Sequence, residues 1–88
     1  MFENYWRYVF WNIPIERITI PEGVKRIGKG AFEGCRNLKT AVLPENLQVL
    51  EDWCFSGAGL TSVDIPKGVE SVGRGVFSGC VSLSKVTF

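Results

Sequence analysis

The chain has 88 residues, of which 45% are hydrophobic and 22% charged, a size and composition that predict one small globular domain. The net charge of +1 lacks the clustered excess of one sign that binding to nucleic acid or to an anionic membrane surface requires. Histidine is absent, which excludes histidine general bases, histidine-activated nucleophiles and most zinc and haem ligation. No stretch approaches about 18 consecutive apolar residues, so no inserted membrane helix is expected.

A pattern of 22–23 residues repeats along the chain. Prolines at 21, 44 and 66 open three units, and an apolar-Phe-x-Gly segment follows each of them, with its phenylalanine at 32, 55 and 77. Each unit closes with leucine, an apolar residue three positions later, and another two beyond that. A unit this short cannot bury its own apolar side chains and must stack on a copy of itself. We therefore predict one β-rich solenoid of about four coils.

The first coil is the least regular. Residues 1–20 are interpreted as a degenerate coil, because Phe2, Tyr5, Val9 and Phe10 fall on apolar positions of the later units when Ile15, Ile18 and Ile20 close it. An amphipathic capping helix over residues 1–14 is the alternative, since its aromatic residues also follow helical spacing. Aromatic and β-branched residues favour the coil. Residues 21–43, 44–65 and 66–88 are predicted as three clear repeats.

Within each clear repeat the sequence predicts two extended stretches. The first repeat has one at residues 24–27 and another at 38–43, where alternation is followed by a proline that cannot donate to a ladder. The second stretches are expected to pair as a parallel sheet, with coils about 4.8 Å apart. Gly28 and Gly30 turn the chain, and Ala31-Phe32 is expected to form a short 3₁₀-like turn that places the phenyl ring in the core.

The cysteines are predicted to be structural. Cys35, Cys54 and Cys80 are odd in number and show no CxxC spacing, which argues against a disulfide framework or a zinc site. Cys35 and Cys80 would lie two coils apart, about 10 Å, which exceeds the roughly 7 Å limit for a disulfide. Alanine and valine occupy the equivalent positions in other repeats, as expected for buried small apolar residues. No metal or cofactor is expected.

Three short motifs resemble catalytic sites but lack their context. Gly28-Lys29-Gly30 has neither the spacing nor the strand-loop-helix setting of a nucleotide loop, and it recurs at residues 73–75. The Glu51-Asp52 pair is interpreted as a solvated turn, because no third group is present to perturb it. Ser84-Lys85 is not a catalytic dyad by spacing alone. We predict that the chain is not an enzyme.

The repeat resembles a known family. Pro-x-x-Val-x-x-Ile-Gly-x-x-Ala-Phe-x-Gly-Cys-x-x-Leu-x-x-Val-x-Ile, read across residues 21–43 and 66–88, is similar to the leucine-rich repeats of the BspA type. The resemblance covers residues 21–88 as three units and residues 1–20 weakly. The chain departs from the family in its first coil, in Ala58 where the family favours cysteine, and in its short length.

The resemblance implies a curved solenoid with a parallel sheet on one face. It also implies a protein–protein interaction module in a cell-surface or secreted protein, bacterial or protozoan, often one involved in adhesion. A structural spacer with no ligand of its own is the alternative. A protein, still unidentified, is the expected partner, rather than nucleic acid or a membrane.

A binding surface is predicted on the outward side chains of the stacked strands, because these are free of packing duty. The candidate residues are Arg17, Thr19, Lys39, Thr40, Val42, Ser62, Asp64, Lys85 and Thr87, within rows that also include Glu16, Thr61 and Ser84.

Aromatic residues away from this face are expected to be exposed, and they have two interpretations: they cover an end of the solenoid, or they form a contact patch. Trp53 and Tyr8 fall on a glycine position of the other repeats, and Trp6 and Trp11 are expected to point away from the core. The last strand pattern runs to residue 88 without a polar cap. An uncapped coil predicts further repeats beyond it, end-to-end self-association, or fraying.

Overall fold

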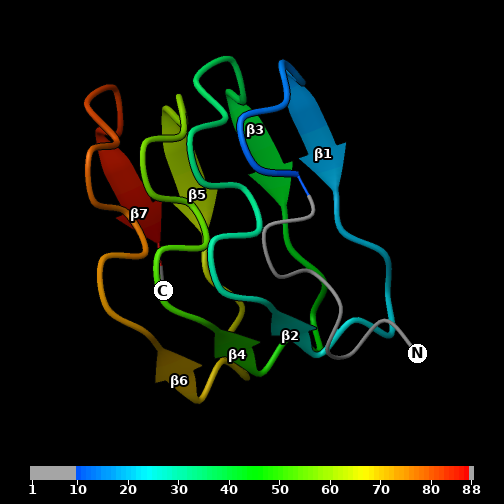
Figure 1. Cartoon of the computed structure of the whole chain (residues 1–88). Helices are drawn as coiled ribbons and strands as arrows, with labels where there is room; N and C mark the ends of the chain where they lie inside the picture. Colours follow the sequence, from blue (N-terminus) through cyan, green and yellow to red (C-terminus); the bar gives the residue numbers. More distant parts are fainter. Residues whose placement is uncertain (1–9, 88) are drawn as a thin grey trace.

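The computed structural model describes residues 10–87, and within them it contains seven short strands and no helix. Two rows of strands run along the stack, one on each side of the core (Figure 1). The first row consists of β1 (Arg17–Thr19), β3 (Thr40–Val42), β5 (Ser62–Asp64) and β7 (Lys85–Thr87). The second consists of β2 (Arg26–Ile27), β4 (Val49–Leu50) and β6 (Ser71–Val72).

The strands pair in parallel, in the register that the repeat predicts. Arg17 of β1 lies opposite Thr40 of β3, and Ser62 of β5 lies opposite Lys85 of β7. In the second row β2, β4 and β6 form one continuous sheet. The parallel β-rich repeat fold is therefore confirmed, while the division into the coils 1–20, 21–43, 44–65 and 66–88 stays a prediction.

The first row differs from the continuous sheet that we expected. Strand pairing joins β1 to β3 and β5 to β7, but in the described part of the chain none joins β3 to β5. The coil of residues 44–65 is one residue shorter than its neighbours between Gly57 and Leu60. Gly59 there lies so close to the preceding coil that a Cβ atom would clash with the carbonyl oxygen of Arg36. We attribute the break to this shortened loop, which draws the coils together just before β5.

The core is built around a column of phenylalanine rings. Neighbouring centroids lie 5.0 Å apart for Phe10 and Phe32, 5.2 Å for Phe32 and Phe55, and 6.1 Å for Phe55 and Phe77, with nearly parallel planes. Phe32 and Phe55 are fully buried. Phe10 therefore occupies the place that the coil interpretation assigns to it. The choice between coil and capping helix for residues 1–9, including Trp6 and Tyr8, lies outside the described residues.

The ring-bearing turns are held by hydrogen bonds within and between coils. Bonds that span three residues, such as Cys35 N–H to the Phe32 carbonyl, close the turns with 3₁₀ spacing. Bonds between coils, such as Phe32 N–H to the Cys54 carbonyl at 2.7 Å, tie each turn to the next. The turn that precedes each ring needs a left-handed residue, which is Gly30 (φ 62°) in one coil and Trp53 (φ 57°) in the next.

Candidate binding face

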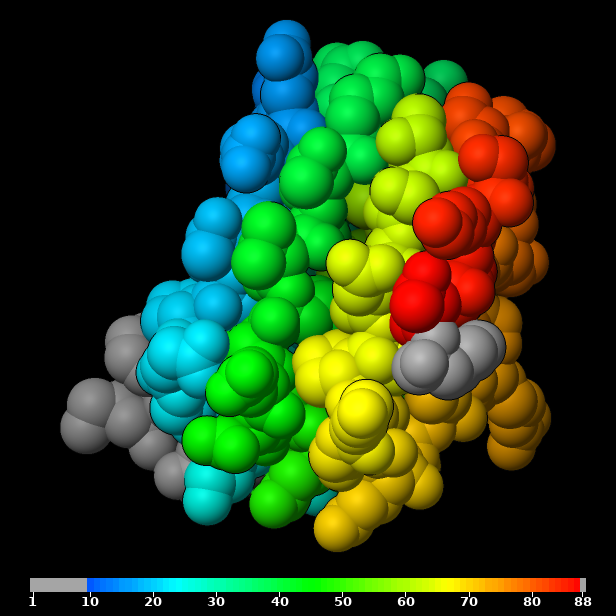
Figure 2. Space-filling view, turned by 180° about the vertical axis from the view of Figure 1, so that it is seen from behind, coloured from blue at the N-terminus to red at the C-terminus, as the bar shows by residue number. Residues whose placement is uncertain are grey.

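The outward face of β1, β3, β5 and β7 carries the candidate binding residues. Alternation along each strand turns Ala41 and Val63 into the core and leaves the flanking residues in solvent. Every candidate is exposed, and the set comprises Arg17, Thr19, Lys39, Thr40, Val42, Ser62, Asp64, Lys85 and Thr87. Figure 2, which views the molecule from behind, shows the coils as adjacent bands coloured from blue to red. The structure thus brings these residues onto one face and does not test their role.

Charges on this face are mixed and sparse. Arg17, Lys39 and Lys85 are cationic, whereas Glu16 and Asp64 are anionic. Within residues 10–87 no ion pair joins any of the five, since the single salt bridge found there connects Arg26 and Glu51 on the other side. Exposed charges that have no ion-pair partner among residues 10–87 can contact a partner protein.

A crevice opens on this face where the ladder is interrupted. It lies between β3 and β5, the green and yellow-green bands of Figure 2, and has a volume of about 220 Å³. Its lining combines the hydroxyl groups of two residues, one carboxylate and small apolar side chains. These residues are Thr40, Ala41, Val42, Leu43, Ser62, Val63 and Asp64. Four predicted site residues, Thr40, Val42, Ser62 and Asp64, therefore share one cavity.

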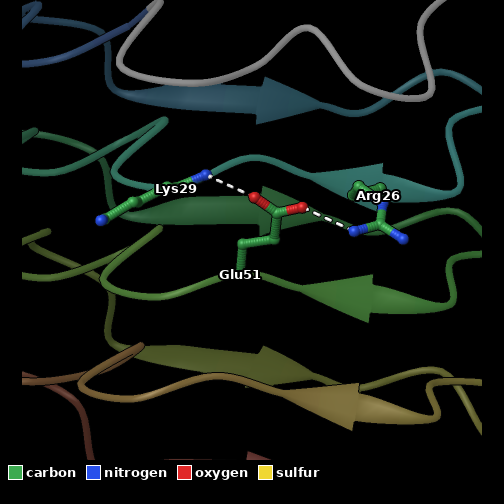
Figure 3. Close-up of polar contacts among 3 residues, drawn as sticks. All are labelled: Arg26, Lys29 and Glu51. Carbon is green, nitrogen blue, oxygen red and sulfur yellow. Dashed lines mark hydrogen bonds and ion pairs between the residues drawn. The ribbon is translucent and has the colours of Figure 1, made fainter.

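The opposite side of the stack corrects our interpretation of the Glu51-Asp52 pair. Glu51 is half-buried and accepts hydrogen bonds from the Arg26 guanidinium at 2.8 Å and from the Lys29 backbone N–H at 3.2 Å (Figure 3). Asp52 accepts one from the Arg74 backbone N–H at 2.8 Å. The two carboxylates are not simply solvated, because Glu51 ties its coil to the one before and Asp52 ties it to the one after.

Trp53 is less exposed than we expected. Its indole ring is half-buried and covers Gly75, where a Cβ atom would clash with the ring. The Lys29 ammonium lies 5.4 Å from the ring centroid. Trp53 therefore packs between coils, whereas Trp11 is 58% exposed as predicted. Packing against the next coil offsets the strain of a left-handed tryptophan.

The three cysteines are free thiols. Cys35 donates its S–H to the Phe10 carbonyl oxygen at 2.9 Å, and Cys80 donates to the Phe55 carbonyl oxygen at 3.1 Å. Burial raises the pKa of the Cys54 thiol far above its ordinary range, and burial also raises the pKa of Cys35 and of Cys80. A raised pKa keeps the thiols protonated and weakly nucleophilic at neutral pH.

Residues 10–87 contain neither a metal-binding cluster nor a membrane-spanning helix. No group of three or more cysteine, aspartate or glutamate side chains is placed to hold a metal ion there. No helix long and apolar enough to cross a membrane occurs in that part of the chain either.

Comparison with known families identifies the repeat. A family model described as BspA type leucine rich repeat region (6 copies) matches residues 4–88, which is nearly the whole chain. The chain belongs to this family. The BspA-type match extends through residues 4–20, where the sequence pattern alone was weak. No curated protein is similar enough to this BspA-type chain to count as a match.

Solved structures of bacterial leucine-rich repeat proteins share the fold. A leucine rich cell surface protein from Faecalibacterium prausnitzii is 38% identical with a TM-score of 0.81, over 82% of this BspA-type chain and 19% of that one. A leucine-rich repeat protein from Bacteroides capillosus is 29% identical with a TM-score of 0.87, over 97% of this chain and 62% of that one. The chain thus spans less than two thirds of either relative.

The sequence indicated the outward positions of this BspA-type repeat but not the crevice or the two bridging carboxylates. The missing residue between Gly57 and Leu60 was a visible signal for the crevice, because a shortened loop shifts the strand that follows it. No signal identified Glu51 as a bridge, since the equivalent position of the first clear repeat is Gly28.

Proposed function

We propose that this chain is a protein-interaction module of a bacterial cell-surface or secreted protein, adhesin-like in its role, which binds its partner through the outward face of β1, β3, β5 and β7. Membership of the leucine-rich repeat family supports the interaction role. The similar protein from F. prausnitzii, described as a cell surface protein, supports the location.

The observation that carries the proposal is the arrangement of exposed side chains on a rigid frame. The backbone of each strand is fixed by ladder hydrogen bonds or by the packed core. The stability of the fold therefore does not depend on which side chains the outward positions carry. Outward residues can therefore be substituted to suit a binding partner while the fold is kept. Charges without an ion-pair partner in the described part of the chain, and a polar crevice on the same face, provide complementary groups for a protein surface.

A structural spacer is the second candidate, and the composition of the face favours it. The outward rows hold no aromatic side chain, although tryptophan and tyrosine are among the residues that dominate binding energy at most interfaces. A spacer would present neighbouring domains without a ligand of its own.

Charge reversal on the face separates the two roles. The triple variant Arg17→Glu, Lys39→Glu, Lys85→Glu changes the face, and the matched triple Lys25→Glu, Lys67→Glu, Arg74→Glu makes the same charge change on exposed positions elsewhere. Both variants and the unchanged chain are applied to an array of purified secreted and cell-surface proteins. Folding of each variant is checked by circular dichroism and thermal unfolding.

The binding module predicts at least one specific partner that the face variant loses and the control variant keeps. Absence of any binder on the array, or equal binding by both variants, would contradict the proposal and favour the spacer.

A further inference from the structure

The crevice lies where β3 and β5 face each other without strand pairing, the one such boundary in the first row of described strands. Just before it, Gly59 N–H donates to the Cys35 carbonyl at 3.1 Å and Thr61 N–H donates to the Lys39 carbonyl at 3.4 Å. Across the core from it, β2 and β4 pair in parallel, Arg26 opposite Val49 and Ile27 opposite Leu50. The coils 21–43 and 44–65 are therefore held together on both sides of the opening, so the crevice is a bounded feature of the fold.

Backbone polar groups line this opening. Successive peptide groups on a strand point to opposite neighbours, and the Val42 carbonyl accepts the Ile20 N–H on the β1 side. The N–H and C=O of Ala41 therefore face β5. By the same alternation, Ile65 N–H donates to Thr87 on the β7 side, so the peptide groups of Ser62 and Asp64 face β3.

The size of the crevice between β3 and β5 limits what it can bind. Inserting a whole strand between β3 and β5 would require about 9.5 Å between them, twice the ordinary strand spacing. Cα atoms of β3 and β5 approach within 8 Å, which is too close for such an insertion. The volume of about 220 Å³ also lies below the roughly 300–1,000 Å³ typical of small-molecule sites. The end of a single side chain fits this space.

The negative charge of Asp64 in the crevice favours a cationic group. Asp64 is the only charged residue in the lining, and its carboxylate receives no hydrogen bond or ion pair from residues 10–87. Carbonyl groups of Ala41 and Ser62 and the hydroxyl of Thr40 add acceptors that are spread around the opening rather than arranged as a planar pair. An ammonium group, with three donors and one positive charge, matches such a site better than a flat guanidinium fork.

We infer that this crevice is a subsite for one lysine side chain of a protein partner, with Asp64 as the counter-ion. The inference rests on the proposed binding role of this face. Arg17 on β1 and Lys85 on β7 flank the crevice one strand away on either side, opposite Thr40 and Ser62. Their charges disfavour a cluster of basic residues. The subsite therefore takes a lone lysine with neutral or acidic neighbours.

The test uses a small probe and needs no known partner. The full 88-residue chain, labelled with ¹⁵N, is titrated with Nα-acetyl-lysine methylamide, and the amide signals of Ala41, Ser62 and Asp64 are followed by NMR. Nα-acetyl-norleucine methylamide, which lacks the ammonium group, is the control probe. Asp64→Asn is the test variant, and Glu22→Gln, an exposed carboxylate in a distant turn, is the control variant.

We expect saturable shifts of these amides with the lysine probe and none with the norleucine probe. Asp64→Asn should weaken the lysine response by about fivefold, the upper range for one exposed charge pair, while Glu22→Gln should leave it unchanged. Equal shifts with both probes, no shifts with either, or an unchanged response in Asp64→Asn would overturn the subsite.

The array experiment distinguishes failure of this inference from failure of the proposed function. A partner that is lost by the face variant but bound normally by Asp64→Asn would preserve the binding role and remove the lysine subsite.

Discussion

Cys35 and Cys80 each donate an S–H hydrogen bond to a backbone carbonyl 25 residues earlier in the chain. Ala58 occupies the equivalent place in the intervening coil and has no donor to offer. At this position a small side chain is what packing requires, and the thiol adds a weak bond to the preceding coil. Cys54 lies at a different position, fully buried, where Ala31 and Val76 are its equivalents.

The raised pKa of Cys54 predicts a loss of stability at alkaline pH. The unfolded thiol ionises near its ordinary pKa of about 8.5, whereas the folded thiol stays protonated, so the unfolded state binds fewer protons as the pH rises. This stabilisation is complete below that value and decreases by up to about 1.4 kcal/mol per pH unit above it. Urea unfolding between pH 8 and 10 should show a shallower decline for Cys54→Ala than for the unchanged chain. Parallel declines would contradict this prediction.

The phenylalanine column predicts a graded response to truncation. Phe55 is fully buried between two rings, whereas Phe77 is only partly buried at the end of the column. Phe55→Leu should lower the free energy of unfolding by about 1–2 kcal/mol, less than the roughly 3–5 kcal/mol of a phenylalanine-to-alanine change. The same substitution at Phe77 should cost less. Chemical denaturation measures both, and an equal cost at the two sites would show that burial in the column does not set the energetics.

At the scale of the elements, strands of two or three residues cannot hold their own conformation and depend on the coils beside them. Glu51 and Asp52 provide two of the ties, each across one boundary between coils. The short loop before β5 accompanies a loss of strand pairing between two coils. It brings Gly59 against Arg36 and is followed by the one unpaired boundary in the first row of described strands.

Close approach at Gly59 predicts that this glycine cannot be replaced. A Cβ atom there would overlap the Arg36 carbonyl oxygen, so Gly59→Ala should cost about 1–3 kcal/mol of stability through forced backbone movement. Gly68 is the matched control, because its nearest neighbours would be 3.7 Å and 3.9 Å from an added Cβ. Gly68→Ala should be neutral or slightly stabilising. Thermal and urea unfolding of the two variants provide the comparison, and similar losses at both positions would argue against the close approach.

Over the whole molecule, burial decreases toward the last described coil. Phe55, Leu60 and Val63 are buried, while their equivalents Phe77, Leu83 and Val86 are partly exposed. Both residues of β6 are exposed, and Val72 and Val81 are 48% and 95% accessible. An apolar end with free strand edges favours contact with another coil.

We expect the 88-residue chain to self-associate reversibly through this end. Sedimentation velocity over a range of concentrations should show a shift toward a dimer, because association buries the partly exposed end of the core. Val72→Lys places a charge on the free edge and should weaken the association, while Val42→Lys on the sheet face should not. A monomer at every concentration would exclude the end as an association surface for this chain.

Much of the molecule was determined by the sequence alone: the repeat period, the ring column, the strand register and the set of outward residues. These follow from local side-chain periodicity and from the need of each short unit to stack on a copy of itself. Only the tertiary structure decided that the first row of strands is broken at the crevice, that Trp53 packs over Gly75, and that Glu51 bridges two coils. Each of these depends on how closely two particular coils approach, and that distance is set by side chains about 22 residues apart in the sequence.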